Sequence, residues 1–407
     1  MSAASAQLEP LGKHVRRTAK PSPEAYGSRN ARRGGSYSPF VPAPIAERPF
    51  PLGDGAAAAV AQATRALATL AGTMPKLTSL DALARNVLRT ESMASSRIEG
   101  VLISQKRLAR NAHTAKSARA SDPEALEVLG NVEAMEKAIE IGARASGFTV
   151  GDIEEIHRTL LRFTEASAIA GVVRTEQNWI GGNDYNPVGA DYVPPPPELV
   201  PELLEDLSSF IARSDLAPVA QAAIAHAQFE NIHPFADGNG RTGRALVYTV
   251  LRRRGETDAF IPPMSLVLAS QPKGYVGGLG AYSQGNVDLW CERFAAATTQ
   301  AVEEAQWVAK AIGALEEQWL VRLGKPRADS AVRELVGQLP AYPVIDAGVA
   351  EAVTGKSHTA VHSALNQMES AGILQPLNEK KWGRAWEAGE LLQLVTDFEE
   401  RVSTPPT

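Results

Sequence analysis

The sequence predicts a mainly α-helical protein with a β-hairpin and a small C-terminal winged helix-turn-helix domain. From about residue 56 to residue 323, apolar residues recur at three- and four-residue spacing, as they do along amphipathic helices. The interval 178–194 breaks this pattern, because Gly, Asn, Asp and Pro separate two short extended segments there. After Lys325-Pro326 the helical patterns become shorter and end in an alternating tail, which is typical of a separate small domain.

The predicted helices follow one another along the chain. Leu80, Leu83, Val87 and Leu88 form the apolar stripe of one helix, which is expected to end at Gly100 as its C-cap residue. Comparable patterns predict helices over residues 123–146, 151–162, 198–213, 216–230, 241–254 and 287–322. A loose β-hairpin is expected to project from this helical body, with strands at residues 178–182 and 191–194.

Residues 325–407 have the outline of a winged helix-turn-helix. A first helix is expected at residues 349–353, then a turn at Thr354-Gly355, and a wing at residues 381–386. The second helix has three apolar residues that are expected to face inward: Val361, Leu365 and Met368. The segment holds eight Lys or Arg and eleven Asp or Glu, a net charge of −3. Since phosphate contacts supply much of the affinity for DNA, DNA binding is doubtful, and protein recognition or dimerisation fits at least as well.

Composition limits the class of protein. The 407 residues carry a net charge of −5 and 44% of them are hydrophobic, which is typical of a globular chain of two or three domains. The sign of the charge excludes a basic nucleic-acid coat. Cys291 is the single cysteine, so no intrachain disulfide can form and a reducing, cytoplasmic location is expected. The longest apolar stretch, residues 56–70, is mostly alanine with polar interruptions, so no membrane-spanning helix is predicted.

Charge is unevenly distributed. Residues 1–50 hold eight Lys or Arg against three Asp or Glu, a net charge of +5, and are rich in Pro, Ser, Gly and Ala. The segment lacks both helical periodicity and the apolar region of a secretory signal. It is therefore expected to be a disordered basic arm.

The segment 233–244, which reads HPFADGNGRTGR, carries the strongest chemical pattern. Gly238 and Gly240 let the backbone turn sharply and approach a ligand closely. Consecutive amides at the start of the next helix make an anion-binding nest, which the helix dipole strengthens. Arg241 and Arg244 are three residues apart, so they share the helix face beside this nest.

Two other residues complete the pattern. Asp237 offers a hard carboxylate oxygen suited to Mg²⁺, and His233 offers a base that titrates near neutral pH. A calcium loop is excluded, because that register places Phe235 and Leu246 at its first and last ligand positions. An anion nest, two arginines, a metal carboxylate and a base together indicate phosphoryl or nucleotidyl transfer.

This segment resembles the signature of the Fic family, H-x-F-x-[DE]-G-N-G-R-x-x-R, at every specified position. The resemblance extends over about residues 80–300 and implies the helical Fic fold. Together with the boundaries above, it predicts four consecutive regions: a disordered basic arm (1–50), an N-terminal helical region with an inhibitory helix (51–120), the Fic catalytic core (121–323) and the winged-helix-like domain (325–407).

Most Fic proteins transfer AMP from ATP to a hydroxyl side chain of a target protein. The resemblance implies that His233 deprotonates the target's Ser, Thr or Tyr hydroxyl, that Asp237 holds Mg²⁺, and that Phe235 packs inward and fixes the loop. It also implies the groups that bind the nucleotide: Asn239 with the amides of Gly238 and Gly240 in an anion hole, Arg241 at a phosphate and Arg244 at the γ-phosphate.

An inhibitory motif precedes the catalytic segment. Residues 95–100, SSRIEG, resemble the family's [ST]-x-x-x-E-[GN] pattern, with Ser95 and Glu99 at its fixed positions. A carboxylate at a helix C-terminus is disfavoured by about 0.3–1 kcal/mol, so Glu99 would be stabilised by a cation. The resemblance implies that this cation is Arg244, which is then unable to bind the γ-phosphate. Whether Glu99 also supports removal of AMP stays open.

The hairpin resembles the flap of the family, which holds the target segment by main-chain pairing. The residues expected to clamp that segment are Ile180, Tyr192 and Val193. The alternative is an edge hairpin that only covers the core. Three aromatic residues that follow the catalytic helix fit either an adenine site or the core: Tyr275, Tyr282 and Trp290.

Two patterns in the C-terminal domain imitate other sites. Gly355-Lys356-Ser357 resembles the end of a Walker A loop, but Ala350 stands where the earlier glycine is required, so a turn is expected. His358 and His362 are spaced like zinc ligands, but no third ligand is evident.

The sequence therefore leaves two hypotheses of different classes. The first is a protein adenylyltransferase that uses ATP and Mg²⁺, is restrained by Glu99, and acts on a target protein of unknown identity, with self-modification and a homodimer as further expectations. The second is a winged-helix regulatory or protein-interaction module in which the Fic core only senses nucleotide. The intact string of His233, Asp237 and Arg244 favours the enzyme.

Overall fold

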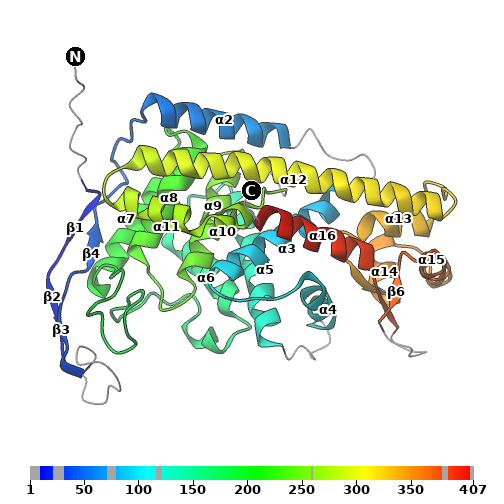
Figure 1. Ribbon diagram of the computed structural model, residues 1–407, viewed down its shortest axis with the longest axis horizontal. Helices are drawn as coiled ribbons and strands as arrows, with labels where there is room; N and C mark the ends of the chain where they lie inside the picture. The colour runs from blue at the N-terminus through cyan, green and yellow to red at the C-terminus, as the bar shows by residue number, and fades with distance from the viewer. Residues whose placement is uncertain are drawn as a thin grey trace. The chain divides into compact units, whose positions relative to one another are not determined.

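The computed structural model describes residues 10–21, 32–70, 79–115, 122–257, 260–377 and 384–403. Its secondary structure is mainly helical, which confirms the predicted fold class, and Figure 1 shows the order of the elements along the chain. The chain divides into two compact units rather than into consecutive segments. Unit 1 takes its described residues from 1–63, 134–255 and 273–296, and unit 2 takes them from 64–133, 256–272 and 297–407.

The elements are assigned to the units as follows. Unit 1 contains β1 (Gly12–His14), β2 (Arg17–Ala19), β3 (Gly35–Tyr37), β4 (Phe40–Pro42), α6 (Val150–Leu161), η2 (Glu165–Ile169), η3 (Pro197–Leu199), α7 (Val200–Ala212), α8 (Pro218–Ile232), α9 (Asn239–Arg253) and α11 (Pro272–Ser283). Unit 2 contains α3 (Leu80–Ile98), α4 (Gln105–Ala115), α10 (Met264–Ser270), α13 (Ala331–Gln338), β5 (Val344–Asp346), α14 (Ala347–Thr354), α15 (His358–Ser370), β6 (Gln375–Pro376), β7 (Ala385–Glu387) and α16 (Gly389–Ser403). Three further helices have residues in both units, α2 (Asp54–Leu70), α5 (Pro123–Gly142) and α12 (Val287–Arg322), and the first residue of α11, Pro272, belongs to unit 2.

The predicted helices match the observed ones closely except at α5. That helix ends at Gly142, four residues before the predicted end, and a Cβ atom there would lie 2.7 Å from Arg252 Cβ and from the Thr249 carbonyl. The close approach of α9 therefore accounts for glycine at this position. The short helices α4, α10 and α11 were not predicted as separate elements.

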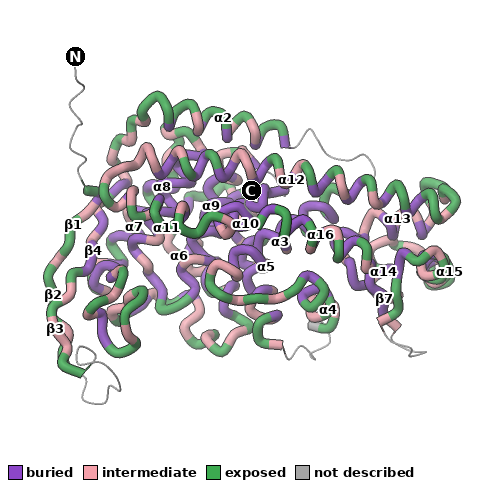
Figure 2. Tube along the Cα trace, in the orientation of Figure 1, coloured by how far each residue is buried: buried purple, intermediate pink, exposed green. Residues whose placement is uncertain are grey.

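The core of unit 1 is built around α8 and α9, which form its most extensive helix pair. Nearly every residue of α8 is buried, and most of α9 is buried as well (Figure 2). Gly243 permits this contact, because a Cβ atom there would lie 2.4 Å from the Glu230 carboxylate and 2.9 Å from the Phe229 ring. The tight packing places the start of α9 beside the end of α8.

The first 50 residues differ from the predicted disordered arm. Where the structure describes them, β1 pairs with β4 and β2 pairs with β3, both antiparallel. Leu11, Phe40 and Ile45 are buried, and the backbone N–H groups of Ile45 and Ala46 donate to the Asp206 carboxylate at 2.6 and 3.0 Å. Composition misled the prediction because these few apolar anchors are outnumbered by basic and small residues.

The C-terminal part of unit 2 contains the predicted helix pair. Gly355, with φ +63°, ends α14, and the Ser357 side chain caps α15 by accepting from the Ala360 N–H, so residues 355–357 form a turn. The inward-facing residues of α15 are buried as expected: Val361, Leu365 and Met368. The strands order as β5-β7-β6. Residues 381–383 of the expected wing lie outside the described residues, whereas Ala385 and Trp386 lie in β7, and the winged-helix assignment stays a prediction.

Within unit 2, α3 is held by residues of the C-terminal part. Arg89 donates to the Ala341 carbonyl at 2.8 Å, and Arg97 forms an ion pair with Glu399 of α16 at 2.8 Å. The Glu399 carboxylate also accepts from Gln105 of α4 at 2.5 Å, and its burial raises the pKa of this group. The helix that carries the SSRIEG motif is thus fixed to α16.

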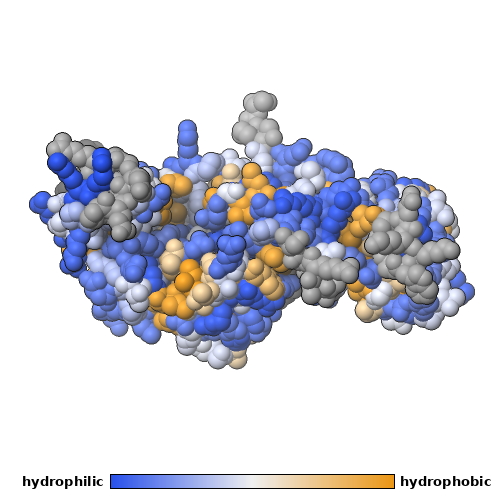
Figure 3. All heavy atoms as spheres, turned by 90° about the horizontal axis from the view of Figure 1, so that it is seen from below, coloured by the Kyte–Doolittle hydropathy of each residue, from blue (hydrophilic) through white to orange (hydrophobic). Residues whose placement is uncertain are grey.

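Figure 3 shows hydrophobic side chains in several small groups among hydrophilic ones on the face that it presents. None of the helices that the structure describes is both long enough and apolar enough to cross a membrane.

Candidate active site

The catalytic candidate His233 sits where α8 ends. It adopts the left-handed conformation, with φ 49° and ψ 60°, and its N–H donates to the Phe229 carbonyl at 2.9 Å. A non-glycine residue in this region stores about 1–3 kcal/mol of strain, which the surroundings must hold in place. The sharp change of direction separates His233 from the helix and leads into the loop before α9.

Arg174 supplies much of that support. The side-chain Nε of Arg174 donates to the His233 carbonyl at 2.9 Å, and the backbone N–H of Arg174 donates to the Pro234 carbonyl at 2.9 Å. Its Nη2 also donates to the Pro195 carbonyl at 2.6 Å. Burial lowers the pKa of this guanidinium to about 10, still far above neutral pH, so a charged side chain holds the His233 and Pro195 carbonyls while the backbone N–H holds that of Pro234.

Phe235 and Asn239 close the loop. The Asn239 side chain accepts from the Phe235 N–H and donates to the Phe235 carbonyl, both at 2.8 Å, and Asn178 donates to the same carbonyl at 2.9 Å. The Phe235 ring is fully buried, as the resemblance implied. The anion-hole role of the Asn239 side chain stays a prediction, because these bonds show it holding the loop.

The helix α9 opens toward the loop. Gly238 is its N-cap residue with φ +75°, and a Cβ atom there would lie 3.0 Å from Leu160 and 3.3 Å from His157. The backbone N–H groups of the first turn, including that of Gly240, have no acceptors within the helix. They lie at the positive end of the helix dipole, which favours an anion. Arg241 and Arg244 are each only 3% exposed on this helix. The structure thus brings the predicted nest and both arginines together.

Asp237 is exposed at the turn before α9. One carboxylate oxygen accepts from the Gly238 N–H at 2.7 Å, and the other lies 3.5 Å from Arg241 Nη2. No group of three or more His, Cys, Asp or Glu side chains that could hold a metal occurs in the described part of the chain. A single carboxylate nevertheless fits Mg²⁺, which proteins commonly bind through one or two carboxylates together with substrate phosphates and water.

A buried histidine of α6 contacts the same loop. His157 Nε2 lies 2.9 Å from the Asp237 carbonyl, while its Nδ1 accepts from the Gly171 N–H at 2.9 Å. Its ring stacks on Phe235 with a centroid distance of 3.7 Å and an interplanar angle of 5°. Burial lowers the pKa of His157 to about 4, so the ring is neutral at physiological pH.

The aromatic residues proposed for adenine pack in the interior of unit 1. Tyr282 and Trp290 are fully buried, and the Trp290 N–H donates to the Ala223 carbonyl at 2.7 Å. The Tyr275 hydroxyl lies 2.8 Å from His226 Nε2, and Tyr275 is 7% exposed. These positions suit core residues, and a contact of Tyr275 with nucleotide stays a prediction.

The flap is reduced to a single bridge between Ile180 and Tyr192. Ile180 is 45% exposed, whereas Tyr192 is half-buried and its hydroxyl donates to the Asn231 carbonyl at 2.7 Å. Val193 is buried, and its carbonyl accepts from the N–H of Phe40 in β4 at 2.8 Å. Of the three predicted clamp residues, Ile180 is therefore the most exposed, and its contact with a target stays a prediction.

The predicted inhibitory motif lies in unit 2, at the end of α3. Ser95 is buried, Glu99 is the C-cap residue, and Gly100 follows with φ +88°. The Val101 N–H donates to the Ser96 carbonyl and the Gly100 N–H donates to the Arg97 carbonyl, both at 3.0 Å, which is a Schellman motif. The predicted helix end is thus confirmed.

Sequence reasoning missed His157, Arg174 and Asn178. A signal existed for His157, because it interrupts the inward-facing apolar stripe of α6 beside Ile153, Ile156 and Leu160. Arg174 and Asn178 lie in irregular segments without periodicity, so no local pattern distinguishes them.

The fold and the site together describe a helical protein with a glycine-containing loop between α8 and α9. Residues 57–140 match the N-terminal region of the Fic/DOC family, and residues 147–251 match the Fic/DOC family. The chain thus contains a Fic/DOC domain, preceded by a region that matches the N-terminal part of the same family.

Curated relatives and a solved structure are consistent with this family match. The proteins named Protein adenylyltransferase Fic from Drosophila willistoni and Drosophila melanogaster are 35% and 34% identical to this chain over 139 residues. That stretch is 33% of this chain and 26% of each relative, so the match spans about a quarter of the relatives' length. A crystal structure of a Fic family protein from Desulfovibrio desulfuricans G20 has 20% identity and a TM-score of 0.51, and covers 84% of this chain and 98% of that one. This second likeness concerns the fold.

Proposed function

We propose that this protein is an adenylyltransferase that moves AMP from ATP to a hydroxyl group of a protein. The observation that carries the proposal is His233, held in the left-handed conformation directly before a helix N-terminus that bears Arg241 and Arg244. A base, an anion nest and two buried cations are the parts that attack on a phosphate requires. The names of the curated relatives support the same chemistry.

The reaction is written from the residues of the chain. Neutral His233 accepts the proton of the target hydroxyl as its oxygen attacks the α-phosphorus. The bond from that phosphorus to the bridging oxygen breaks, and pyrophosphate leaves. The amides at the start of α9, with Arg241 and Arg244, stabilise the negative charge on the phosphates.

Asp237 is the residue that would hold Mg²⁺ beside the nucleotide. Bound there, the ion would neutralise charge on the α- and β-phosphates. Ile180 of the flap would contact the target segment. The free, buried Cys291 and the use of ATP support a reducing, cytoplasmic setting.

Regulation by Glu99 is part of the proposal. Its position as the C-cap of α3 gives the carboxylate an unfavourable place in the helix dipole, which a cation would correct. Arg244 is the proposed partner. ATP bound while this pair exists would lack its γ-phosphate contact and sit unproductively.

The test is incubation of the protein and a cell lysate with ATP labelled at the α-phosphorus and Mg²⁺. Glu99→Gly should label protein more strongly than wild type, and His233→Ala in the Glu99→Gly background should lose about 10²- to 10⁴-fold of that labelling. Equal labelling by wild type and Glu99→Gly contradicts the regulation. Undiminished labelling by the His233→Ala variant contradicts the proposed mechanism.

A further inference from the structure

His157 joins the catalytic loop to the helix behind it. The side chain is fully buried, and both of its ring nitrogens bind backbone groups, one of the loop and one of Gly171. A residue that only filled the core would not need two polar atoms there, because burying polar groups is unfavourable unless each is paired. The two hydrogen bonds therefore point to a more specific task.

The hydrogen bonds fix the tautomer of the ring. Nδ1 accepts from the Gly171 N–H, so it carries no hydrogen, and Nε2 must carry it. Nε2–H then donates to the Asp237 carbonyl. The ring face at the same time covers Phe235, two residues earlier in the loop.

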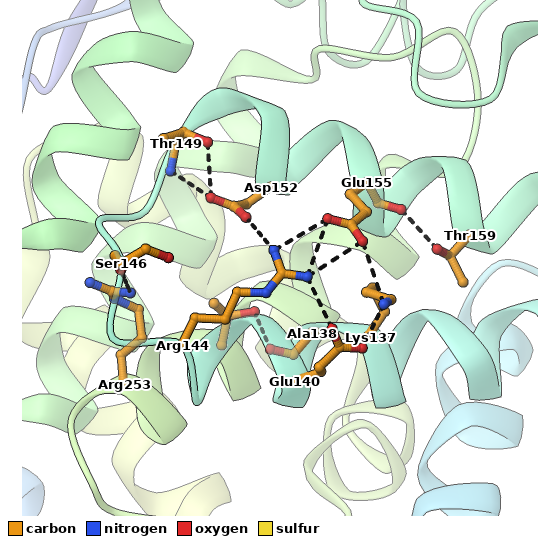
Figure 4. A network of polar contacts seen from close by, with 11 residues as sticks. Lys137, Ala138, Glu140, Arg144, Ser146, Thr149, Asp152, Glu155, Thr159 and Arg253 are labelled. Carbon is orange, nitrogen blue, oxygen red and sulfur yellow. Dashed lines mark hydrogen bonds and ion pairs between the residues drawn. The ribbon is translucent and has the colours of Figure 1, made fainter.

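The helix that carries His157 is itself fixed. Thr149 and Asp152 form a capping box at the start of α6, and Arg144, just after α5, contacts Asp152 at 3.1 Å and Glu155 at 3.3 Å. Lys137 of α5 adds a contact with Glu155, and Figure 4 shows these charged groups converging between the two helices. Because α6 is anchored in this way, the ring of His157 is held in a fixed position against the loop.

We propose that His157 is a positioning residue, which acts through the Asp237 backbone to set where the Asp237 carboxylate meets the metal–nucleotide complex. The proposal rests on the proposed function. A displacement of about 1 Å at a reacting centre can cost about 10²-fold in rate. Losing the hydrogen bond to Asp237 should therefore lower the rate of transfer by more than the loss of folding stability alone would explain. The catalytic base itself remains in place, because Arg174 holds His233 separately.

Two substitutions separate the two hydrogen bonds. His157→Gln can put an amide N–H at the ε position, where it reaches the Asp237 carbonyl. His157→Asn can put an amide oxygen at the δ position, where it accepts from Gly171 but leaves Asp237 unbound. Ile153→Val, buried one turn earlier on α6, is the control for a small loss of packing.

The first readout is nucleotide binding, measured by calorimetry with a non-hydrolysable ATP analogue with and without Mg²⁺. His157→Asn should weaken binding in Mg²⁺ by about 10-fold and leave binding without Mg²⁺ nearly unchanged, whereas His157→Gln and Ile153→Val should bind as wild type does. The second readout is transfer in the Glu99→Gly background, where His157→Asn should fall by about 10- to 100-fold and His157→Gln should retain most of the rate.

The proposal is overturned if the losses of binding and transfer in His157→Asn and His157→Gln only follow the fall in their melting temperatures. It is also overturned if His157→Asn binds the Mg²⁺ complex like wild type. Absence of transfer by the Glu99→Gly protein itself counts against the proposed function instead, and the binding measurement then still decides the role of His157.

Discussion

At the scale of single residues, the site depends on histidines in contrasting settings. His233 is half-buried at a strained turn, whereas His157 and His226 are fully buried. The motif identified His233 because its spacing to the glycines and arginines is local. The other two could not be assigned a role from sequence, since their partners, Asp237 and Tyr275, are distant in the chain.

His226 should make stability depend on pH. Burial lowers its pKa from 6.5 to about 3, so the folded protein keeps it neutral while the unfolded chain takes up a proton as the pH falls below about 6.5. Its contribution is therefore complete above pH 6.5 and is lost on acidification toward pH 3, by up to about 1.4 kcal/mol per pH unit. Urea unfolding at a series of pH values measures this slope.

The matched variant is His226→Gln, whose amide can still reach the Tyr275 hydroxyl but does not titrate. Between pH 6.5 and 4 the free energy of unfolding of this variant should fall less steeply with pH than that of wild type. The difference in slope should approach about 1.4 kcal/mol per pH unit, which corresponds to one bound proton. Above pH 7 the two slopes should coincide. Parallel slopes over the acidic range would show that His226 is protonated in the folded state.

At the scale of elements, glycines decide how closely helices approach. On α11, a Cβ atom at Gly278 would lie 2.6 Å from the Trp290 ring, whereas a Cβ atom at Gly280 would meet nothing within 4 Å. The sequence pattern PKGYVGGLGAYS did not distinguish these glycines, because both lie within one helical turn. Only the packing of α12 against one face gives them different roles.

The pair Gly278→Ala and Gly280→Ala tests this packing. Gly280→Ala should stabilise the protein by about 0.5–1 kcal/mol, because it removes backbone freedom from the unfolded chain and adds no contact. Gly278→Ala should destabilise it by about 1–3 kcal/mol through overpacking against the buried Trp290. Thermal unfolding measures both, and a gain in melting temperature for Gly278→Ala would contradict the described packing.

At the scale of the whole molecule, the sequence predicted what is periodic or local. The extents of α7, α8, α9 and α12 follow from apolar spacing, and the loop before α9 follows from its motif. The strands of the first 50 residues were missed, because Leu11, Phe40 and Ile45 are too few to form a pattern. The division into two units, each assembled from separated segments, was missed as well, because it depends on tertiary packing.

In the candidate site, too, the local sequence motif was predicted and the tertiary contacts were missed. Residues 233–244 were predicted to act together, and the structure brings His233, Asp237 and the start of α9 together. Arg174, which holds His233 in its left-handed conformation, was not foreseen, since a lone arginine in an irregular segment carries no local signal. Sequence thus predicted the candidate reacting groups, and the structure added the residues that hold them.

The central claim is that AMP, rather than phosphate, is transferred. It is tested most directly by incubating the Glu99→Gly protein and lysate with Mg²⁺ and ATP labelled either at the α-phosphorus or at the γ-phosphorus. The account predicts protein labelling from the α-position alone, abolished by adding His233→Ala. Labelling from the γ-position, or α-labelling that survives the loss of His233, would contradict it.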